Sequence, residues 1–467
     1  MNSDILNVCY LLTAVTFMLG LKLMNGPKTA RQGNLLAAGG MGLALLATFF
    51  SPDAQGKPLG NFGLIALALV IGSFFGAWSA RKVQMTAMPQ MVALFNGLGG
   101  GAVALVAIVE YPKLFAEGHV SSVSLVTTVL SLIIGNLSFS GSMVAYGKLQ
   151  ELLPGKPIQM PGHKFVNGLL FLGTIGLAVV LLTGGRNDMF AYVLLGLSLV
   201  LGLMLVLPIG GADMPVVISL LNSFTGCAAG LAGFVLNNTA LLIGGGLVGA
   251  SGLILTLDMC KAMNRPLSNV LFGAFGGSPV GGGGSGSTAT GTVRSYSVED
   301  AAIIFNSANS VIIVPGYGMA VAQAQHVVKE LAAKLAERDV DVKYAIHPVA
   351  GRMPGHMNVL LAEADVPYEQ LYDLDEINSA FAETDVALVI GANDVVNPAA
   401  RYDKTSPIYG MPILDVDKAK TVIVSKRGMS PGFAGIENEL FLNPNTIMVF
   451  GNAKTTIAKL SSAIDAL

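Results

Sequence analysis

The sequence predicts a polytopic α-helical membrane domain of nine spanning helices, followed by an α/β, Rossmann-like domain built on a parallel sheet. Only 12% of the 467 residues are charged, about half the share of an average soluble protein. Of the 56 charged residues, 19 lie before residue 261 and 37 after residue 260. Apolar runs of strand length alternate with helical stretches near the C-terminus. We therefore expect a membrane domain over residues 1–260, a glycine-rich linker over 261–291 and a water-soluble domain over 292–467.

Nine apolar stretches approach the roughly 20 residues that a spanning helix needs. They cover residues 5–23, 35–50, 62–78, 91–109, 123–146, 165–182, 190–207, 216–235 and 241–257. Because nine is odd, the two ends of this part lie on opposite sides of the membrane. The odd-numbered loops and the segment after the ninth stretch hold ten Lys and Arg residues, and the even-numbered loops hold three. Since cytoplasmic loops carry the excess of Lys and Arg, the amino terminus is expected outside and the C-terminal domain in the cytoplasm or the mitochondrial matrix.

An internal repeat relates two of these stretches. The segment 88–96, which begins with Met-Pro, reappears at 214–222 with a spacing of 126 residues. Repeats of this kind mark duplicated bundles with a site at the repeat interface. Asn96 and Asn222 each stand eight residues past the Met, roughly 12 Å along a helix. Two such amides either join helices or line a polar pathway, and the sequence leaves both open.

Asp213 immediately precedes the second Met-Pro. Asp is a favoured helix N-cap and Pro is tolerated in the first turn, which indicates a structural role. The same carboxylate would lie at the cytoplasmic mouth of the helix, where the soluble domain could touch it. The two interpretations are compatible.

The join between the two parts is rich in glycine. Residues 273–291 contain nine glycines, which predicts a flexible connector. Beyond it, strands are expected over residues 311–314, 342–346, 371–374, 386–390, 421–425 and 447–450. Helices are expected over a stretch that ends at residue 338, near 357–364, near 376–381 and over 453–464.

A glycine-containing turn follows the first expected strand and opens a helix, where a dinucleotide fingerprint stands. Its residues are Gly316, Tyr317, Gly318, Met319, Ala320 and Val321. The first glycine makes the tight turn, and the second lets the backbone approach a phosphate. Val321 replaces the third glycine of the motif, so the turn alone indicates only a nucleotide fold.

Two strand ends bear on the kind of dinucleotide. The second strand runs into His347 with no acid to bind the adenine ribose of NAD(H), which disfavours that cofactor and allows a phosphorylated ribose. Lys426 and Arg427 follow another strand and suit a 2′-phosphate, although such a pair can also be a solvated surface.

The turn after the fourth expected strand and the histidines are less specific signals of function. Gly391, Ala392, Asn393 and Asp394 also follow a strand's carboxyl end, where ligands of parallel sheets bind, but they would equally make an ordinary turn. His347 and His356 have no companion at a metal-ligand or nucleophile spacing, so we interpret them as structural groups or pocket walls. No metal site is predicted.

Taken together, these features resemble the beta subunit of proton-translocating NAD(P) transhydrogenase over essentially the whole chain. The most specific matches are residues 259–265, 346–364, 375–378 and 389–400. The resemblance implies an enzyme that passes a hydride directly from NADH, held by a separate alpha subunit, to NADP⁺ held by this chain. It further implies that inward proton translocation drives the transfer, and that NADP(H) is bound in a reversed orientation relative to ordinary Rossmann domains.

The resemblance also assigns residues. Asp394 would be an essential acid close to the cofactor, Lys426 and Arg427 would hold the 2′-phosphate, and a lid would run through Gly432 and Phe433, where other members often have Tyr. The nicotinamide and pyrophosphate region would be lined by Gly316, Tyr317, Gly318, Met319, Ala320, Val321, Ala350, Gly351, Arg352, Met353, Pro354 and Gly355. Backbone contacts would come from Gly451, Asn452 and Ala453.

For the cell, the resemblance implies a multi-pass protein of the bacterial inner membrane, assembled with alpha subunits as a dimer of alpha–beta units. The net charge of −2 gives no sign of a nucleic-acid partner. Many members carry a His in the helix after the first Met-Pro, where this chain has Asn96, which does not titrate. The proton path would then need Asp213, water held by Asn96 and Asn222, or a group from the partner subunit.

Two other functions fit parts of the sequence. A transporter or channel gated by a cytoplasmic nucleotide-binding domain is the main alternative, but its domain would usually keep the ribose-binding acid and its pore a selectivity filter. A structural membrane subunit with a vestigial nucleotide fold is the other, and the Lys426–Arg427 pair argues against it.

Overall fold

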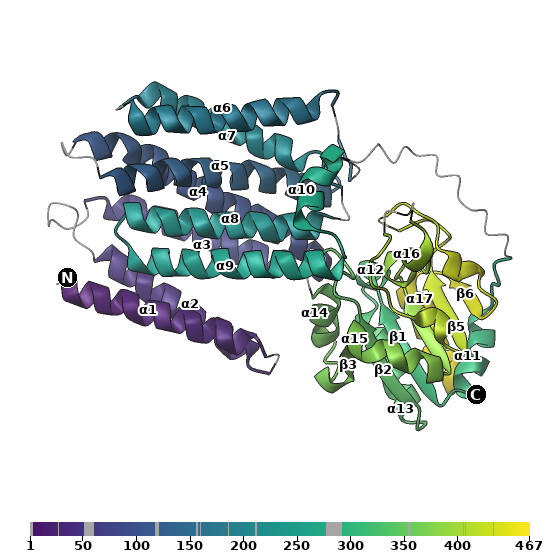
Figure 1. Ribbon diagram of the computed structural model, residues 1–467. Helices are drawn as coiled ribbons and strands as arrows, with labels where there is room; N and C mark the ends of the chain where they lie inside the picture. The colour runs from purple at the N-terminus through teal and green to yellow at the C-terminus, as the bar shows by residue number, and fades with distance from the viewer. Residues whose placement is uncertain are drawn as a thin grey trace. The chain divides into compact units, whose positions relative to one another are not determined.

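The computed structural model describes residues 3–467 except 27, 51–59, 117–120, 156, 159, 185, 211–212, 277–291, 354, 405, 407 and 433. The chain divides into two compact units, one of Met1–Gly210 with Val217–Thr256 and one of Gly211–Val216 with Leu257–Leu467. In the described part of the chain, nine helices are long and apolar enough to span a membrane, and a six-stranded parallel sheet follows them (Figure 1). The predicted fold class is confirmed.

All nine predicted apolar stretches are helical. Their bounds are α1 Ser3–Met24, α2 Ala30–Phe49, α3 Phe62–Lys82, α4 Met88–Ala116, α5 Ser122–Leu149, α6 His163–Thr183, α7 Asp188–Val206, α8 Met214–Val235 and α9 Thr239–Ala262. The largest difference at a helix end concerns α4, which passes the predicted end at residue 109 by seven residues, and α5 passes its predicted end at residue 146 by three. Lys148, expected in a loop, therefore lies within the last turn of the helix.

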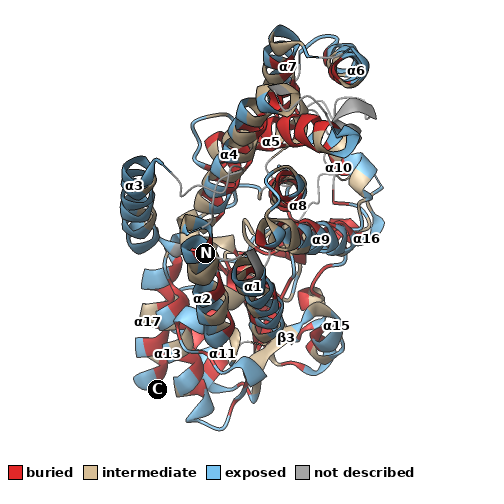
Figure 2. Cartoon of the chain, turned by 90° about the vertical axis from the view of Figure 1, so that its left-hand side faces the viewer, coloured by how far each residue is buried: buried red, intermediate tan, exposed pale blue. Residues whose placement is uncertain are grey.

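The spans differ in how far neighbours enclose them. Within their most apolar windows, 67% of α8 and 50% of α5 are buried, whereas α3 buries no residue (Figure 2). Because lipid is as apolar as Leu, an exposed apolar span needs no protein cover in a bilayer. The two central helices are thus the ones where polar side chains are shielded from lipid.

The two copies of the internal repeat fold alike. Both Met residues are the first residues of their helices, α4 and α8, so the repeated Asn falls at the same depth from each start. The repeat-equivalent glycines make equivalent contacts with the following helix. A β-carbon at Gly100 would lie 2.8 Å from the carbonyl oxygen of Gly135 in α5, and one at Gly226 would lie 2.4 Å from the amide nitrogen of Gly249 in α9. Small residues let such membrane helices approach closely.

The soluble part is a parallel sheet with the strand order β3-β2-β1-β4-β5-β6. Its strands are β1 Ser310–Pro315, β2 Asp341–Ile346, β3 Leu371–Asp373, β4 Val386–Ile390, β5 Thr421–Lys426 and β6 Thr446–Phe450. Strands β1, β4, β5 and β6 are almost wholly buried, as expected when both faces of a sheet are covered. The chain order reverses between β1 and β4, and ligands of such sheets bind outside the carboxyl ends at that point.

The helices around the sheet are α11 Val298–Asn306, α12 Tyr317–Val321, α13 Gln325–Ala336, α14 His356–Glu363, α15 Leu374–Ile377, α16 Ala399–Tyr402 and α17 Ala453–Asp465. The expectation of one continuous helix after β1 is wrong, because the chain breaks between α12 and α13, where Gln323 has φ +52°. The break explains why Val321 can replace a glycine: its side chain is 44% exposed rather than pressed between helix and sheet.

Two further helices, α11 and α10, differ from the expectation: the first was not predicted, and the second lies in the expected linker. α11 begins with a capping box between Ser297 and Asp300, a signal that the sequence carried. Of the expected linker, Leu267–Gly276 forms helix α10, and residues 277–291 lie outside the described part.

His347 ties the end of β2 to a distant loop. Its Nδ1 accepts a hydrogen bond from the Val349 amide at 3.2 Å, so Nε2 carries the proton and donates to the Pro412 carbonyl at 2.7 Å. Burial lowers its pKa to about 4, and the bond to Pro412 only partly opposes this. The imidazole is therefore a neutral structural group in the folded protein.

This burial predicts a loss of stability in acid. The unfolded chain protonates His347 near pH 6.5 and the folded chain only near pH 4, so stability is lost as the pH falls through this window. Between pH 7.5 and 5 the loss is roughly 2 kcal/mol from this residue. Denaturant unfolding of His347→Gln, which keeps a donor for Pro412, should show a flatter pH dependence than the wild type. His326→Gln, at an exposed position in α13, should leave the wild-type slope, and equal slopes for all three proteins would refute the assignment.

Candidate functional site

Four loops at the carboxyl edge of the sheet are joined by backbone hydrogen bonds in strand order. The Gly316 amide donates to Ile390 O at 2.9 Å, the Gly391 amide to Ser425 O at 3.1 Å, and the Gly451 amide to Lys426 O at 3.0 Å. These bonds continue the ladder beyond the strands, from β1 across β4 and β5 to β6. The predicted cofactor-binding segments after these four strands are therefore connected.

The switch point between β1 and β4 is filled by glycine backbone. The Gly318 amide donates to Gly391 O at 2.9 Å, and a β-carbon at Gly318 would lie 2.6 Å from Gly391 Cα. Gly391 has φ +64°, a conformation that also favours glycine. The second glycine of the fingerprint was expected to make room for a phosphate; the structure shows that it first makes room for the neighbouring loop. Met319 and Ala320 are buried behind this contact.

The loop after β2 folds over the β1 loop. The Arg352 guanidinium lies 4.4 Å from the centre of the Tyr317 ring, a cation–π contact. The Arg352 amide donates to His356 Nδ1 at 3.1 Å, and His356 is buried at the start of α14. Ala350 is buried, while Gly351 and Met353 are half-buried. Gly355 precedes α14 with φ +65°, and Pro354 lies outside the described residues.

The β4 and β5 loops meet at Asp394. Its Oδ2 accepts a hydrogen bond from the Ala434 amide at 2.9 Å, and a β-carbon at Gly432 would lie 2.4 Å from its Oδ1. The loop predicted as a lid thus rests on this carboxylate; Phe433 itself is outside the described residues. Asn393 is fixed by Asn438, whose side-chain amide donates to its carbonyl oxygens at 2.9 and 3.0 Å.

The two cations after β5 differ in their surroundings. Lys426 ends the strand, donates to the Ser430 carbonyl and lies 5.5 Å from the centre of the Phe441 ring. Burial lowers the pKa of Lys426, and the nearby charge of Asp394 partly offsets this. Arg427 is exposed, and none of the ion pairs among the described residues includes it. Arg427 is thus placed to meet an anion from solution.

The edge offers unsatisfied polar atoms that suit a bound dinucleotide. Ser425 Oγ, at the end of β5, and Asn393 Nδ2 are buried without a hydrogen-bond partner among the described residues. Buried polar groups are rarely left unpaired, so such atoms indicate a missing polar ligand. On the β6 side, Asn452 caps α17 and Ala453 is buried, which leaves the Gly451 turn at the edge. For the described side chains, no cluster of three or more His, Cys, Asp or Glu could hold a metal ion.

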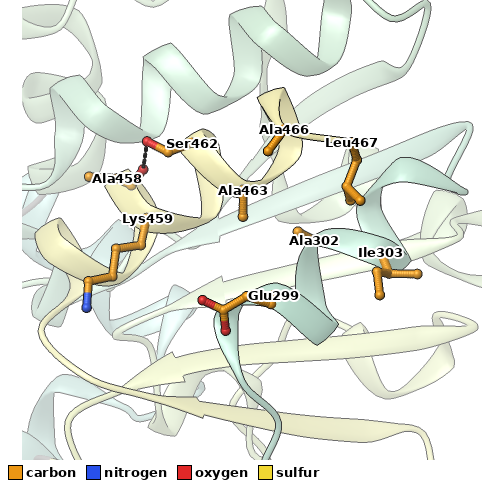
Figure 3. A pocket seen from close by; sticks show the side chains of 9 residues that line it. All are labelled: Glu299, Ala302, Ile303, Ala458, Lys459, Ser462, Ala463, Ala466 and Leu467. Atoms are coloured by element: carbon orange, nitrogen blue, oxygen red, sulfur yellow. Dashed lines mark hydrogen bonds between the residues drawn. The ribbon is translucent and has the colours of Figure 1, made fainter.

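A groove of about 720 Å³ lies elsewhere, between α11 and α17 (Figure 3). Its walls are small and aliphatic side chains with Glu299 and Lys459. None of its nine lining residues belongs to the predicted site.

In the membrane helices, Asn96 is the centre of a buried polar cluster. Its side-chain amide donates to Ser142 Oγ at 2.9 Å and lies 3.5 Å from Ser138 Oγ. Ser138 in turn donates to the Leu221 carbonyl at 2.9 Å and lies 2.5 Å from Thr225 Oγ1. The cluster joins α4, α5 and α8 and consists of groups that do not titrate at neutral pH.

Neither of the other two membrane candidates shares a side-chain hydrogen bond with Asn96. Asn222 is half-buried in α8, one residue after Leu221, and no hydrogen bond joins the side chains of Asn96 and Asn222. Asp213 Oδ1 accepts a hydrogen bond from Arg265 Nη1 at 2.7 Å in a partly buried ion pair. Burial raises the pKa of Asp213 even though Arg265 acts in the opposite direction. Such a carboxyl takes up a proton more readily than an exposed one.

The loops of the site could be predicted from the sequence, but the residues that support them could not. Ser425 and Asn438 carried no motif, and Arg265 stood in a family-specific stretch without an assigned role; the roles of all three depend on contacts between segments far apart in the sequence. Ser138 and Ser142 were visible as polar residues in an apolar helix, which was the only signal for the Asn96 cluster.

The glycine contact at the switch point makes a specific prediction. Gly318→Ala places a β-carbon within 2.6 Å of Gly391 Cα, so both loops must shift. Overpacking of this kind costs about 1–3 kcal/mol, which should lower the melting temperature of the soluble part and loosen the site. Gly428→Ala, where no heavy atom lies within 4 Å, is the matched control. Equal melting temperatures for the two variants would contradict the contact.

Comparisons with known proteins assign the chain to a family. Residues 6–463 match the family described as NAD(P) transhydrogenase beta subunit. Two curated relatives, each named NAD(P) transhydrogenase subunit beta, come from Rhodospirillum rubrum and from a designated strain of that species. Each is 48% identical over 474 aligned positions, which cover 100% of both chains. The chain therefore belongs to the NAD(P) transhydrogenase beta subunit family.

Proposed function

We propose that this chain binds NADP(H) at the carboxyl edge of its sheet and accepts a hydride from NADH on an alpha subunit, coupled to inward proton movement. The observation that carries the proposal is the exposed Arg427 beside Lys426, at the end of β5, combined with the absence of an acid at the end of β2. A bound NADP⁺ would supply the hydride-accepting ring. Hydride transfer needs no acid or base from the protein, so the residues act by positioning.

The strand order supports the reversed orientation of the cofactor. The cations follow β5, which is separated from β2 by β1 and β4, roughly 14 Å at the usual strand spacing. In ordinary Rossmann domains the residue that reads the ribose follows β2. A phosphate held by Arg427 would place the adenosine over β5 and the nicotinamide on the side of Tyr317 and Arg352. Ser425 and Asn393 would then complete their hydrogen bonds along the phosphates.

The membrane part would carry the proton through groups of two kinds. The Asn96 cluster offers a chain of hydroxyl and amide groups between α4, α5 and α8, shielded from lipid. Asp213 offers a titratable carboxyl whose pKa is raised by burial. We infer that water beside Asn96 and Asn222 relays protons and that Asp213 exchanges them next to Arg265. This would place the soluble domain in the cytoplasm of a bacterium, with the amino terminus outside.

The alpha subunit would bring the NAD(H) domain and further membrane helices, and the assembly would be a dimer of alpha–beta units. The names of the family and of its relatives support the existence of such a partner, because a beta subunit implies another chain. The bare surface of α3 leaves room for membrane helices of another chain.

The 2′-phosphate assignment predicts a selective loss of affinity. Arg427→Ala removes a charge-assisted contact worth about 1.5–3 kcal/mol, so the affinity for NADP⁺ should fall roughly 10- to 100-fold. Affinity for NAD⁺, which lacks the 2′-phosphate, should change less than about twofold. Titration of both nucleotides onto the assembled enzyme measures the two values.

The control for this experiment is Lys459→Ala, which removes one exposed cation from the α11–α17 groove. It should leave both affinities at the wild-type level. Equal losses for NADP⁺ and NAD⁺ in Arg427→Ala would reject the role of Arg427.

Asp213 should matter for coupling rather than for cofactor binding. Asp213→Asn keeps a hydrogen-bond acceptor for Arg265 but cannot exchange a proton near neutral pH. In sealed vesicles we expect the stimulation of transhydrogenation by an imposed proton gradient to fall at least about tenfold, as for loss of one proton-transfer group. NADP⁺ affinity should stay close to the wild-type value. Asn222→Ala should act in the same direction.

Asp188→Asn is the matched control, because Asp188 also forms a 2.7 Å ion pair, with Arg186, but in an exposed position at the start of α7. It should retain full stimulation. Wild-type stimulation in both Asp213→Asn and Asn222→Ala would refute the proposed proton path.

A further inference from the structure

Lys148 is the one buried charged side chain in the part of the chain that the structure describes. Its exposed fraction is 4%, whereas every other described Asp, Glu, Lys and Arg is at least partly exposed. A charge withdrawn from water inside a membrane protein is costly, and such residues are seldom kept without a function. The site described above does not use Lys148, and none of the ion pairs among the described residues includes it.

The ammonium is held by backbone carbonyls at the end of α7. Lys148 Nζ donates to Leu207 O at 2.5 Å and to Ile209 O at 2.7 Å. The C-terminal end of a helix carries partial negative charge, so a cation there is electrostatically favoured. The Leu207 carbonyl also accepts a hydrogen bond from the Ile158 amide at 3.1 Å. Lys148 therefore fixes the residues that follow α7, from Leu207 to Ile209, against the last turn of α5.

The residue next to Lys148 holds the start of α4, the first copy of the repeat. Leu149 O accepts a hydrogen bond from Gln90 Nε2 at 3.1 Å, and Gln90 lies in the first turn of α4, directly after the Met-Pro pair. The last turn of α5 thus contacts both the first turn of α4 and the residues that follow α7. The same two helices, α4 and α5, carry Asn96 and its serine partners.

We propose that Lys148 is a positioning residue for proton coupling, a fixed cation that holds the end of α7 against the end of α5, next to the start of α4. The inference rests on the proposed proton coupling of this protein. With the ammonium in place, Asn96 in α4 keeps its alignment with Ser138 and Ser142 in α5. Without it, the segment after α7 loses two charge-assisted bonds, and the path loses its alignment while the nucleotide loops stay intact.

A purely structural cap would have different consequences. Met204 O, one turn earlier in α7, is also capped, by His163 Nε2 at 2.8 Å and Asn167 Nδ2 at 3.1 Å. If the end of α7 only needed capping, loss of the Lys148 bonds and loss of the bonds to Met204 O would have the same effect. Both would lower the stability of the protein. If Lys148 positions the helices that form the Asn96 cluster, only the loss of the bonds to Leu207 and Ile209 changes coupling.

The test uses the complete enzyme, with its alpha subunit, in sealed vesicles. The variants are Lys148→Met, which keeps the length of the side chain without charge, Lys148→Arg, which keeps the cation, and Asn167→Leu as the matched control. Three quantities are measured: the ratio of transhydrogenation rates with and without an imposed proton gradient, the NADP⁺ affinity, and the melting temperature.

We expect Lys148→Met to bring the rate ratio close to 1, with an NADP⁺ affinity within threefold of the wild type. Lys148→Arg should recover at least half of the wild-type stimulation, and Asn167→Leu should keep it. Full stimulation in Lys148→Met, or an equal loss in Asn167→Leu, overturns the proposal.

Two further outcomes are also decisive. If Lys148→Met does not assemble, Lys148→Gln, which keeps one donor group, replaces it and is judged by the same ratio. If neither assembles while Asn167→Leu does, Lys148 serves folding and the proposal is overturned. Absence of any stimulation in the wild type would instead reject proton coupling itself, so the two failures are distinguishable.

Discussion

The nucleotide edge of this protein depends on one close contact, the backbone of Gly318 against the backbone of Gly391. It lies between the loops of β1 and β4, where the strand order reverses and where a parallel sheet has its natural crevice. Because neither residue has a β-carbon, the two loops can approach closely enough to share a hydrogen bond. Together they form the floor of the crevice. The β5 loop, with its cations, is then attached to this floor through Asp394 and Gly391.

The membrane unit follows the same principle in another solvent. Helices α4 and α8 each approach the next helix through a repeat-equivalent glycine, and polar side chains collect where three helices meet. In water, burial of apolar surface drives such packing, but lipid supplies no such force between helices. Close backbone approach and interhelical hydrogen bonds therefore carry more of the specificity in this half. Glycine thus serves two purposes in this chain: it lets two loops of the soluble sheet touch, and it lets membrane helices pack closely.

Much of the architecture could be predicted from local patterns. Hydropathy gave all nine spans, alternation gave the six strands, and the Met-Pro repeat placed Asn96 and Asn222 at matching depths. The patterns failed where a distant contact decides the outcome. The break after α12 and the burial of Lys148 depend on neighbours that no short window contains. For the site, strand ends predicted which loops would meet, but the partners of Asp213 and Asn96 came only from the tertiary structure.

The exposed Val321 has a consequence for how this fold is recognised and varied. The usual three-glycine signature assumes a long helix that packs directly on the first strand, and the early end of α12 removes that requirement. Residue 321 should therefore vary freely among related proteins. A change at Gly318 would instead require a compensating change in the loop after β4. A search pattern for such domains would gain specificity by pairing Gly318 with the remote Gly391 and dropping the third glycine.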